Sequence, residues 1–191
     1  PQLFRVIPNA VLPINVPPID RPELFKRLRI PERGRVVGAV GRLWKQKGYE
    51  DLVWSAELLR VAYQDVCVVV IGDGPELQRL QRLRDQYGAA DALRFVGHRH
   101  DALQLMSAFD ILWNGSRYEG QSNTILEAMS WGIPVVASDI PGNRDLVIPE
   151  QTGTLFQLGD CGELTRRTNV LLRDDDEMRR MGVNARARIQ Q

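Results

Sequence analysis

Cysteine, histidine and long apolar runs are scarce in this sequence, and each shortage excludes a class of protein. The 191 residues include two cysteines and two histidines. Cys67 and Cys161 lie far apart and provide neither a disulfide framework nor a metal-ligand spacing. His98 and His100 have no third histidine and no cysteine at ligand spacing. We therefore expect no metal site and no cofactor.

Charge of one sign is also lacking. Twenty-five Lys plus Arg against 24 Asp plus Glu leave a net charge of +1, so nothing favours a nucleic-acid partner. No apolar run approaches the ~20 residues of a membrane span, and the first residues lack a signal-peptide pattern. We expect a cytoplasmic protein with no transmembrane segment.

The remaining composition is that of a globular protein. Hydrophobic residues make up 43% and charged residues 26%, and the length suffices for one ordinary α/β domain. The sequence starts at Pro1 without a Met, and four prolines (8, 13, 17 and 18) stiffen its first segment. Such a segment is typical of an interdomain connector. We expect residues 1–20 to be the remnant of a linker and residues 21–191 to be one domain of a larger protein.

Apolar strands alternate with amphipathic helices after a polar stretch at residues 20–35. The expected strands are 36–41, 66–71, 93–96, 109–113 and 133–137. The expected helices are 49–61, 75–87, 101–108 (with Asp101 as its cap), 123–131, 161–172 and 175–189. A short segment at 145–148 and a turn at Gly153 complete the pattern. It predicts an α/β fold: a doubly wound, Rossmann-like parallel sheet flanked by helices.

Most of the unusual residues fall in the loops that follow the predicted strands. A parallel sheet binds ligands beyond the carboxyl ends of its strands. The candidate loops are 41–48, 72–76, 97–100, 114–124 and 138–143. The clustering of glycines and charges in these loops predicts a functional cleft.

Residues 114–132 form the most informative stretch. A strand, a loop with two glycines and a helix follow in that order, which places free backbone N–H groups and a helix N-terminus at the sheet edge. Such an edge binds phosphate. Glu119 and Glu127 flank the turn as hydrogen-bond acceptors, and this combination suits a nucleotide sugar. Arg42 and Lys47, after another strand, would neutralise its diphosphate.

Each of these residues also has an ordinary structural interpretation. Arg42 and Lys47 are alternatively exposed cations, and Glu119 a solvated loop charge. Thr124 to Glu127 matches a capping box, in which the glutamate only satisfies a backbone donor.

Two enzyme classes are disfavoured by spacing. Gly38 and Gly41 do not form the dinucleotide fingerprint, and Ser116 is not in the Gly-x-Ser-x-Gly elbow of serine hydrolases. Ser122, Asn123 and Thr124 can each cap the following helix, so their backbone amides are better binding candidates than their side chains.

The residues resemble a known family. Glu119-Gly-Gln-Ser-Asn-Thr-Ile-Leu-Glu127 resembles the E-x7-E motif of the retaining glycosyltransferases of family 4 (glycosyl transferases group 1), which have the GT-B fold. Further matches, in the family's order, are Val40-Gly-Arg-Leu…Lys-Gly48, Ile71-Gly-Asp-Gly-Pro75, Phe95-Val-Gly97, Glu127-Ala-Met…Gly-Ile-Pro-Val-Val-Ala-Ser-Asp139, Pro141-Gly-Asn143 and Thr152-Gly153. Val6-Ile-Pro-Asn9 resembles the interdomain link, with Ala10 in place of a glycine, and Asp145 stands where a glutamate is common.

The resemblance implies that the chain is the C-terminal, donor-binding half of such an enzyme, one half of a GT-B fold. Arg42 and Lys47 would hold the diphosphate, Glu119 the sugar hydroxyls and Glu127 the ribose. Backbone groups of Gly120, Gln121, Ser122, Asn123 and Thr124 would meet the distal phosphate and the sugar. Gly41 lies in the diphosphate loop, and Gly72, Gly74, Gly97 and His98 would border the base and ribose.

The resemblance also sets the expected partners. The donor is a nucleoside-diphosphate sugar, and the acceptor site belongs to an N-terminal domain absent from this chain, which leaves room for peripheral membrane contact through that domain. The fragment alone is expected to bind nucleotide without transferring sugar. The alternatives are a GT-B-related nucleotide-sugar epimerase or phosphorylase, or a non-catalytic nucleotide-binding module.

Overall fold

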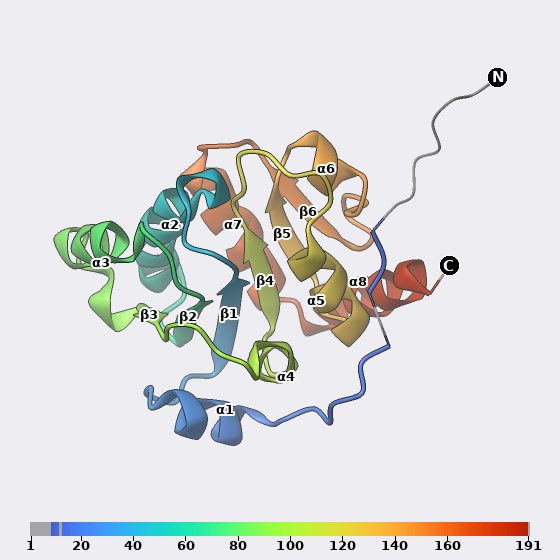
Figure 1. The fold of residues 1–191 in the computed structure, drawn as a ribbon, viewed down its shortest axis with the longest axis horizontal. Coiled ribbons are helices and arrows are strands. Elements are labelled where there is room, and N and C mark those ends of the chain that lie inside the picture. Colours follow the sequence, from blue (N-terminus) through green and yellow to red (C-terminus); the bar gives the residue numbers. More distant parts are fainter. Residues whose placement is uncertain (1–8, 12, 191) are drawn as a thin grey trace.

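A computed structural model of the chain describes residues 9–11 and 13–190. Within these residues, six parallel strands form one sheet with helices on both of its faces (Figure 1). The strands are β1 (Arg35–Val40), β2 (Val66–Ile71), β3 (Leu93–Phe95), β4 (Ile111–Asn114), β5 (Val135–Ser138) and β6 (Gly153–Phe156). The predicted α/β parallel fold is confirmed.

Helices α2 to α6 connect successive strands, α1 precedes β1, and α7 and α8 follow β6. The α-helices are α1 (Arg21–Leu28), α2 (Tyr49–Ala62), α3 (Leu77–Gln86), α4 (Ala102–Met106), α5 (Asn123–Trp131), α6 (Pro141–Arg144), α7 (Cys161–Leu172) and α8 (Asp175–Ile189). Two short 3₁₀ helices are η1 (Lys45–Lys47) and η2 (Ala89–Asp91). None of the helices within the described ranges combines the length and the apolar character that crossing a bilayer requires.

The strand order places a crevice at the centre of the sheet. The order is β3-β2-β1-β4-β5-β6, so the chain starts in the middle, builds one half outward and then returns to build the other. The direction reverses between β1 and β4, which are neighbours with Val37 opposite Ile111. In doubly wound sheets, ligands bind outside the carboxyl ends of the two strands that flank this switch point. In Figure 1 those ends lie toward α6, and α1 lies at the opposite end of the molecule.

Two hydrophobic cores sandwich the sheet. One includes buried residues of α1, α4 and α5, and the other includes buried residues of α2, α3 and α7. All six residues of β2 are buried, because helices cover both of its faces. Cys67, in this strand, is buried, and desolvation raises the pKa of its thiol to about 11.

The polar stretch expected at residues 20–35 is wrong in part, because it contains α1. Asp20 caps this helix by accepting a hydrogen bond from the backbone N–H of Glu23 at 2.9 Å. Its charged residues conceal a narrow apolar face, Leu24, Phe25 and Leu28, which is buried against the sheet. Eight residues give too short a pattern for the periodicity to stand out.

A sixth strand and a short helix are also additions to the predicted elements. Residues 153–156, expected as a turn, form β6 at the edge of the sheet, and residues 141–144, expected as loop, form α6. A Cβ at Gly153 would lie 2.3 Å from the carbonyl oxygen of Val135. The glycine therefore reflects close strand pairing as well as a turn.

The remaining boundaries differ by a few residues. β5 starts two residues late, because the N–H of Ile133 bonds to the carbonyl of Ala128 and closes the end of α5. Gly132 ends α5 in the left-handed conformation. Asp101 precedes α4 without capping it, since its carboxylate pairs with Arg99 at 2.8 Å instead.

The expected linker lies partly outside the described residues, which exclude 1–8 and 12. The described part runs over the domain surface without regular structure. The N–H of Ile19 donates to the Ser107 hydroxyl at 3.0 Å, and the carbonyl of Pro17 accepts from Gln104 at the same distance. A role as interdomain linker stays a prediction.

Candidate functional site

The turn that follows β1 carries the two predicted cations. Leu43 anchors it, fully buried and with its N–H bonded to the carbonyl of Asp73 at 2.9 Å. Arg42 is exposed and its guanidinium lies over the ring of Trp44, 5.8 Å from the ring centre. Lys47 ends the 3₁₀ helix η1.

Lys47 makes an ion pair with Glu119, which lies in the loop after β4. The two side chains are 24% and 10% exposed. Glu119 is therefore not the solvated charge of the ordinary interpretation. Its Oε1 atom also accepts a hydrogen bond from the hydroxyl of Ser116 at 2.7 Å.

The β1 and β4 loops are joined along their length by close backbone contacts. The N–H of Arg117 donates to the carbonyl of Gln46 at 2.8 Å, and the Gln46 side chain donates to the carbonyl of Tyr118 at 3.0 Å. Gly48 has a φ of 63°, and a Cβ there would lie 2.0 Å from the carbonyl oxygen of Gly115. Only glycine permits this approach, which holds Lys47 beside Glu119.

Glycines shape the neighbouring loops after β2 and β3. A Cβ at Gly72 would lie 1.8 Å from the carbonyl oxygen of Gly41, and one at Gly74 would lie 2.6 Å from that of Leu43. These two predicted site glycines thus bring the β2 loop against the β1 loop. Gly97 has a φ of 72° with open space around its Cβ position, and His98 follows it on the surface, edge-to-face with His100.

The N-terminus of α5 has no side-chain cap. Ser122 occupies the cap position, but its hydroxyl accepts from the Asn114 side chain at 3.0 Å instead of from the helix. Thr124 donates to the carbonyl of Val40 at 3.3 Å, at the end of β1. The N–H groups of the first turn have no partner within a helix, so this end of α5 is suited to bind an anion.

Two predicted donor-binding side chains face the first segment of the chain. Asn9 donates from its backbone to the Gln121 side chain at 2.7 Å and from its amide to Gln121 and Asn123 at 3.2 Å. The side chains of Gln121 and Asn123 are therefore engaged by Asn9. That the backbone amides of residues 122–124 bind a ligand stays a prediction.

Glu127 does not form the capping box that its spacing allowed. Helix α5 begins at Asn123, so Thr124 is inside the helix and Glu127 is too far along to reach a cap residue. Glu127 shares a helix face with Thr124. Burial raises the pKa of its carboxyl, and no described residue donates a hydrogen bond to it or pairs with it.

A network of buried polar side chains holds the loop after β4 in place. The sequence did not indicate this network. The Ser138 hydroxyl donates to the carbonyl of Ser116 at 2.5 Å, and Asn143 donates to the carbonyl of Ser138 at 2.9 Å. The oxygen of the Asn114 side chain accepts from the N–H of Ser116 at 3.1 Å. All four side chains are at least 90% buried. They join β4, β5 and α6, which are distant in sequence.

Tyr49 is a further residue near the site that the sequence did not indicate. A Cβ at Gly41 would lie 3.1 Å from the Tyr49 hydroxyl, which places that hydroxyl beneath the β1 turn. Burial, and secondarily the charge of Glu119, raise its pKa. Tyr49 is therefore a neutral donor at neutral pH.

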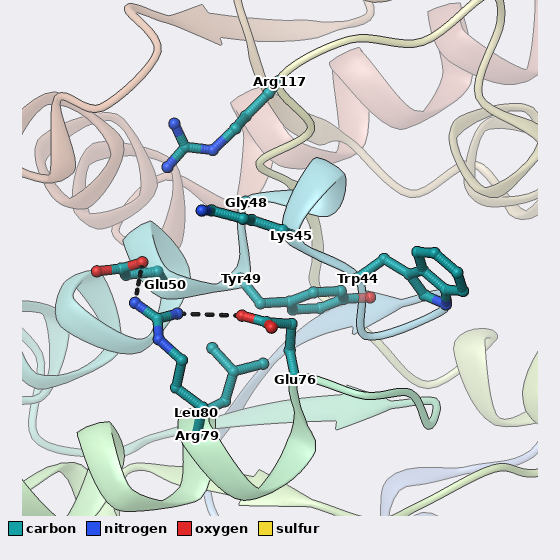
Figure 2. A pocket seen from close by; sticks show the side chains of 9 residues that line it. All are labelled: Trp44, Lys45, Gly48, Tyr49, Glu50, Glu76, Arg79, Leu80 and Arg117. Atoms are coloured by element: carbon teal, nitrogen blue, oxygen red, sulfur yellow. Dashed lines mark hydrogen bonds and ion pairs between the residues drawn. The ribbon is translucent and has the colours of Figure 1, made fainter.

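A shallow hollow lies beside the site; its lining draws on the candidate loops 41–48 and 72–76 but includes none of the individual residues predicted to bind the donor. Figure 2 shows its lining: Trp44, Lys45, Gly48, Tyr49, Glu50, Glu76, Arg79, Leu80 and Arg117. Arg79 crosses it, paired with Glu50 at 2.6 Å and with Glu76 at 3.2 Å. Across the described ranges, no group of three or more His, Cys, Asp or Glu side chains is placed to hold a metal ion.

Comparison with known proteins identifies the family. The family profile described as "Glycosyl transferases group 1" matches residues 20–188. The chain therefore belongs to the glycosyl transferases group 1 family, as the sequence resemblance implied. It is 34% identical over 185 residues to a 2-deoxystreptamine N-acetyl-D-glucosaminyltransferase of Streptomyces fradiae, which covers 93% of this chain and 44% of that protein.

Solved structures show the same fold. The crystal structure of Anabaena Alr3699/HepE in complex with UDP and glucose aligns with a TM-score of 0.82 and 29% identity, covering 92% of this chain and 48% of that one. The C-terminal domain of LpcC, a group 1 glycosyl transferase of Francisella tularensis, aligns with a TM-score of 0.79 at 22% identity, covering 91% and 93%. The fold is thus that of one domain of a GT-B glycosyltransferase. The chain spans about half the length of the curated relatives it matches.

Proposed function

We propose that this chain is the donor-binding half of a retaining glycosyltransferase that uses a UDP- or GDP-type sugar. The observation that carries the proposal is the placement of Lys47 and the uncapped N-terminus of α5 at the β1/β4 switch point. A cation and free backbone N–H groups at one sheet edge suit a diphosphate. Anabaena HepE, which shares this fold over 48% of its chain at 29% identity, was crystallised in complex with UDP and glucose, and this supports the choice of ligand.

Each of the candidate residues binds a different part of the nucleotide sugar. Arg42 and Lys47 hold the diphosphate with the first-turn amides of α5 and the backbone of Gly120 to Thr124. Glu127, half-buried and without a protein partner among the described residues, accepts from the ribose hydroxyls. Glu119 offers its second oxygen to the sugar hydroxyls. The loops at Gly72–Gly74 and at Gly97–His98 border the base and ribose.

These groups face the negative charge that develops during sugar transfer. The bond between the sugar's anomeric carbon and the phosphate oxygen breaks, and negative charge builds on the departing diphosphate. Arg42, Lys47 and the α5 N-terminus stabilise that charge, which is electrostatic catalysis without a metal. The acceptor hydroxyl enters on the same face, forms the new glycosidic bond and gives its proton to the leaving phosphate. The anomeric configuration is thereby retained.

The acceptor is a hydroxyl of a glycan, lipid or polysaccharide precursor. Relatives differ in their named acceptors: one is a 2-deoxystreptamine transferase, and an Escherichia coli relative, 32% identical, is a UDP-Gal:alpha-D-GlcNAc-diphosphoundecaprenol galactosyltransferase. We propose that an N-terminal domain outside this sequence binds the acceptor and that the present chain binds nucleotide without turnover.

A calorimetric panel tests this function. The chain is titrated with UDP, GDP and ADP, and then incubated with the matching sugar nucleotides and a range of acceptors. We expect one diphosphate to bind and no sugar to be transferred. Binding of none would favour a scaffolding module, and turnover by the chain alone would contradict the assignment of the acceptor site to another domain.

A further inference from the structure

The two carboxylate oxygens of Glu119 have different surroundings. Oε1 accepts from the ammonium of Lys47 and from the hydroxyl of Ser116, the latter at 2.7 Å. Oε2 has no hydrogen-bond partner among the residues described. The side chain is only 10% exposed, so its orientation is set by these two donors. One oxygen is thus fixed by protein, and the other is left for a ligand.

Ser116, which contacts Glu119, is 1% exposed, and hydrogen bonds fix its backbone on both sides. Its N–H donates to the Asn114 side chain at 3.1 Å, and its carbonyl accepts from the Ser138 hydroxyl at 2.5 Å. Ser138 in turn accepts from Asn143 at 3.1 Å. These bonds hold the Ser116 backbone in place, and the one hydrogen bond that its hydroxyl makes among the described residues is to Glu119.

The two donors to Glu119 respond differently to a bound diphosphate. Lys47 has a flexible four-carbon stem, and phosphate oxygens compete with the carboxylate for its ammonium. The Ser116 side chain is short and buried, so its hydroxyl cannot move away as the Lys47 ammonium can. When Lys47 turns to phosphate, the hydroxyl of Ser116 is the donor that stays on Oε1.

We propose that Ser116 is the positioning residue for Glu119: its hydroxyl keeps the carboxylate directed at the donor sugar while Lys47 engages the diphosphate. This inference rests on the proposed function, because it needs Glu119 at the sugar. It predicts that Ser116 affects recognition of the sugar and leaves recognition of the nucleoside diphosphate nearly unchanged.

The test compares two affinities in each variant. Calorimetry gives the dissociation constants of UDP and UDP-glucose (or of GDP and GDP-mannose, if GDP binds better). The dissociation constant of UDP divided by that of UDP-glucose measures how much the sugar contributes to binding. We expect Ser116→Ala to lower this ratio about three- to tenfold, the worth of one hydrogen bond, with the UDP constant within about twofold of wild type. Ser130→Ala is the matched control, since its hydroxyl donates to a backbone carbonyl in α5 at 2.9 Å without touching Glu119. It should leave both constants unchanged.

A double-mutant cycle separates positioning from general loosening of the loop. In a Glu119→Ala background the acceptor of the Ser116 hydroxyl is gone, so Ser116→Ala should have little further effect on the ratio. If Ser116→Ala does not fold, Ser116→Cys keeps the volume and replaces the hydroxyl with a weak donor. It should give the same loss to a smaller degree.

Three results would contradict the positioning role, and the third would also contradict the proposed function. An unchanged sugar ratio in Ser116→Ala, with wild type showing a clear sugar contribution, overturns the positioning role and leaves the proposed function standing. Equal additional loss in the Glu119→Ala background overturns it too. A wild-type chain that binds neither nucleotide, or binds UDP-glucose no better than UDP, overturns the proposed function or its assignment of Glu119, and this inference with it.

Discussion

Lys47 and Glu119 form an ion pair across the point where the strand order of the sheet reverses. The two residues lie 72 positions apart, on the loops after β1 and β4. Because the pair is largely shielded from solvent, each group depends on the other for its charge partner. Any anion that binds Lys47 must therefore compete with Glu119.

Removal of Lys47 should weaken binding of the diphosphate far more than binding of the nucleoside. A charge-assisted hydrogen bond to phosphate contributes about 1.5–3 kcal/mol, so Lys47→Ala should cost about 10- to 100-fold in affinity for the nucleoside diphosphate. Lys45→Ala, an exposed cation on the same turn, is the control and should cost little. Equal losses for diphosphate and nucleoside in Lys47→Ala would argue against a phosphate contact.

Gly48 should be intolerant of any side chain, since its Cβ position overlaps the backbone of Gly115. Gly88 is a matched control, because its φ of 74° is similar and nothing lies within 4 Å of its Cβ position. Gly88→Ala should cost about 1–2 kcal/mol of unfolding free energy from the left-handed conformation alone. Gly48→Ala should cost clearly more in urea unfolding. Similar values for the two would show that the β1 and β4 loops separate without penalty.

The central strands and long helices were predictable because burial determines their pattern. β2 is a continuous apolar run between two layers of helix, and a run of this kind can be recognised without tertiary information. Helix α1 was missed because its apolar face consists of three residues among charges, and β6 because four residues beginning with a glycine are typical of a turn. Short elements derive their stability from packing, which local sequence does not record.

Glu127 should destabilise the fold at neutral pH. Burial raises the pKa of its carboxyl in the folded chain above the unfolded value. The folded state then binds more protons than the unfolded state as pH rises through the ordinary glutamate range, so the group lowers stability above that range and has no effect below it. Glu127→Gln should therefore raise the unfolding midpoint at pH 7 and change it little near pH ~4. The same variant should lose nucleotide affinity by about tenfold.

Exposed Glu32 offers the control for this experiment. Glu32→Gln should shift neither the unfolding midpoint nor the nucleotide affinity. A Glu127→Gln chain that is less stable than wild type at pH 7 would indicate that the carboxylate has a favourable protein partner after all.

Asn9 should order the start of α5. It makes three hydrogen bonds to Gln121 and Asn123, all exposed to solvent, so Asn9→Ala should change global stability by no more than about 1 kcal/mol. Amide hydrogen exchange should accelerate locally, at residues 121–123, because the loop loses its tether. Unchanged exchange there would show that the first segment does not restrain the site.

The site was predictable in outline only. Loops after parallel strands were identified from strand order, and Arg42, Lys47, Glu119 and the first turn of α5 do lie on the loops and helix end that flank the switch point. The capping box at Glu127 was wrong because the helix begins two residues earlier than that pattern needs: its cap position is Ser122, not Thr124. The contact of Ser116 with Glu119 depends on the path of a loop held by β5 and α6, and no spacing in the sequence encodes it.

The most direct measurement is a crystal structure of the chain with its best-binding nucleotide sugar. We expect the diphosphate at the N-terminus of α5, contacted by Lys47 and Arg42, with Glu127 at the ribose and Glu119 at the sugar. A diphosphate bound elsewhere, for example at Lys45 and Arg117 in the neighbouring hollow of Figure 2, would contradict it.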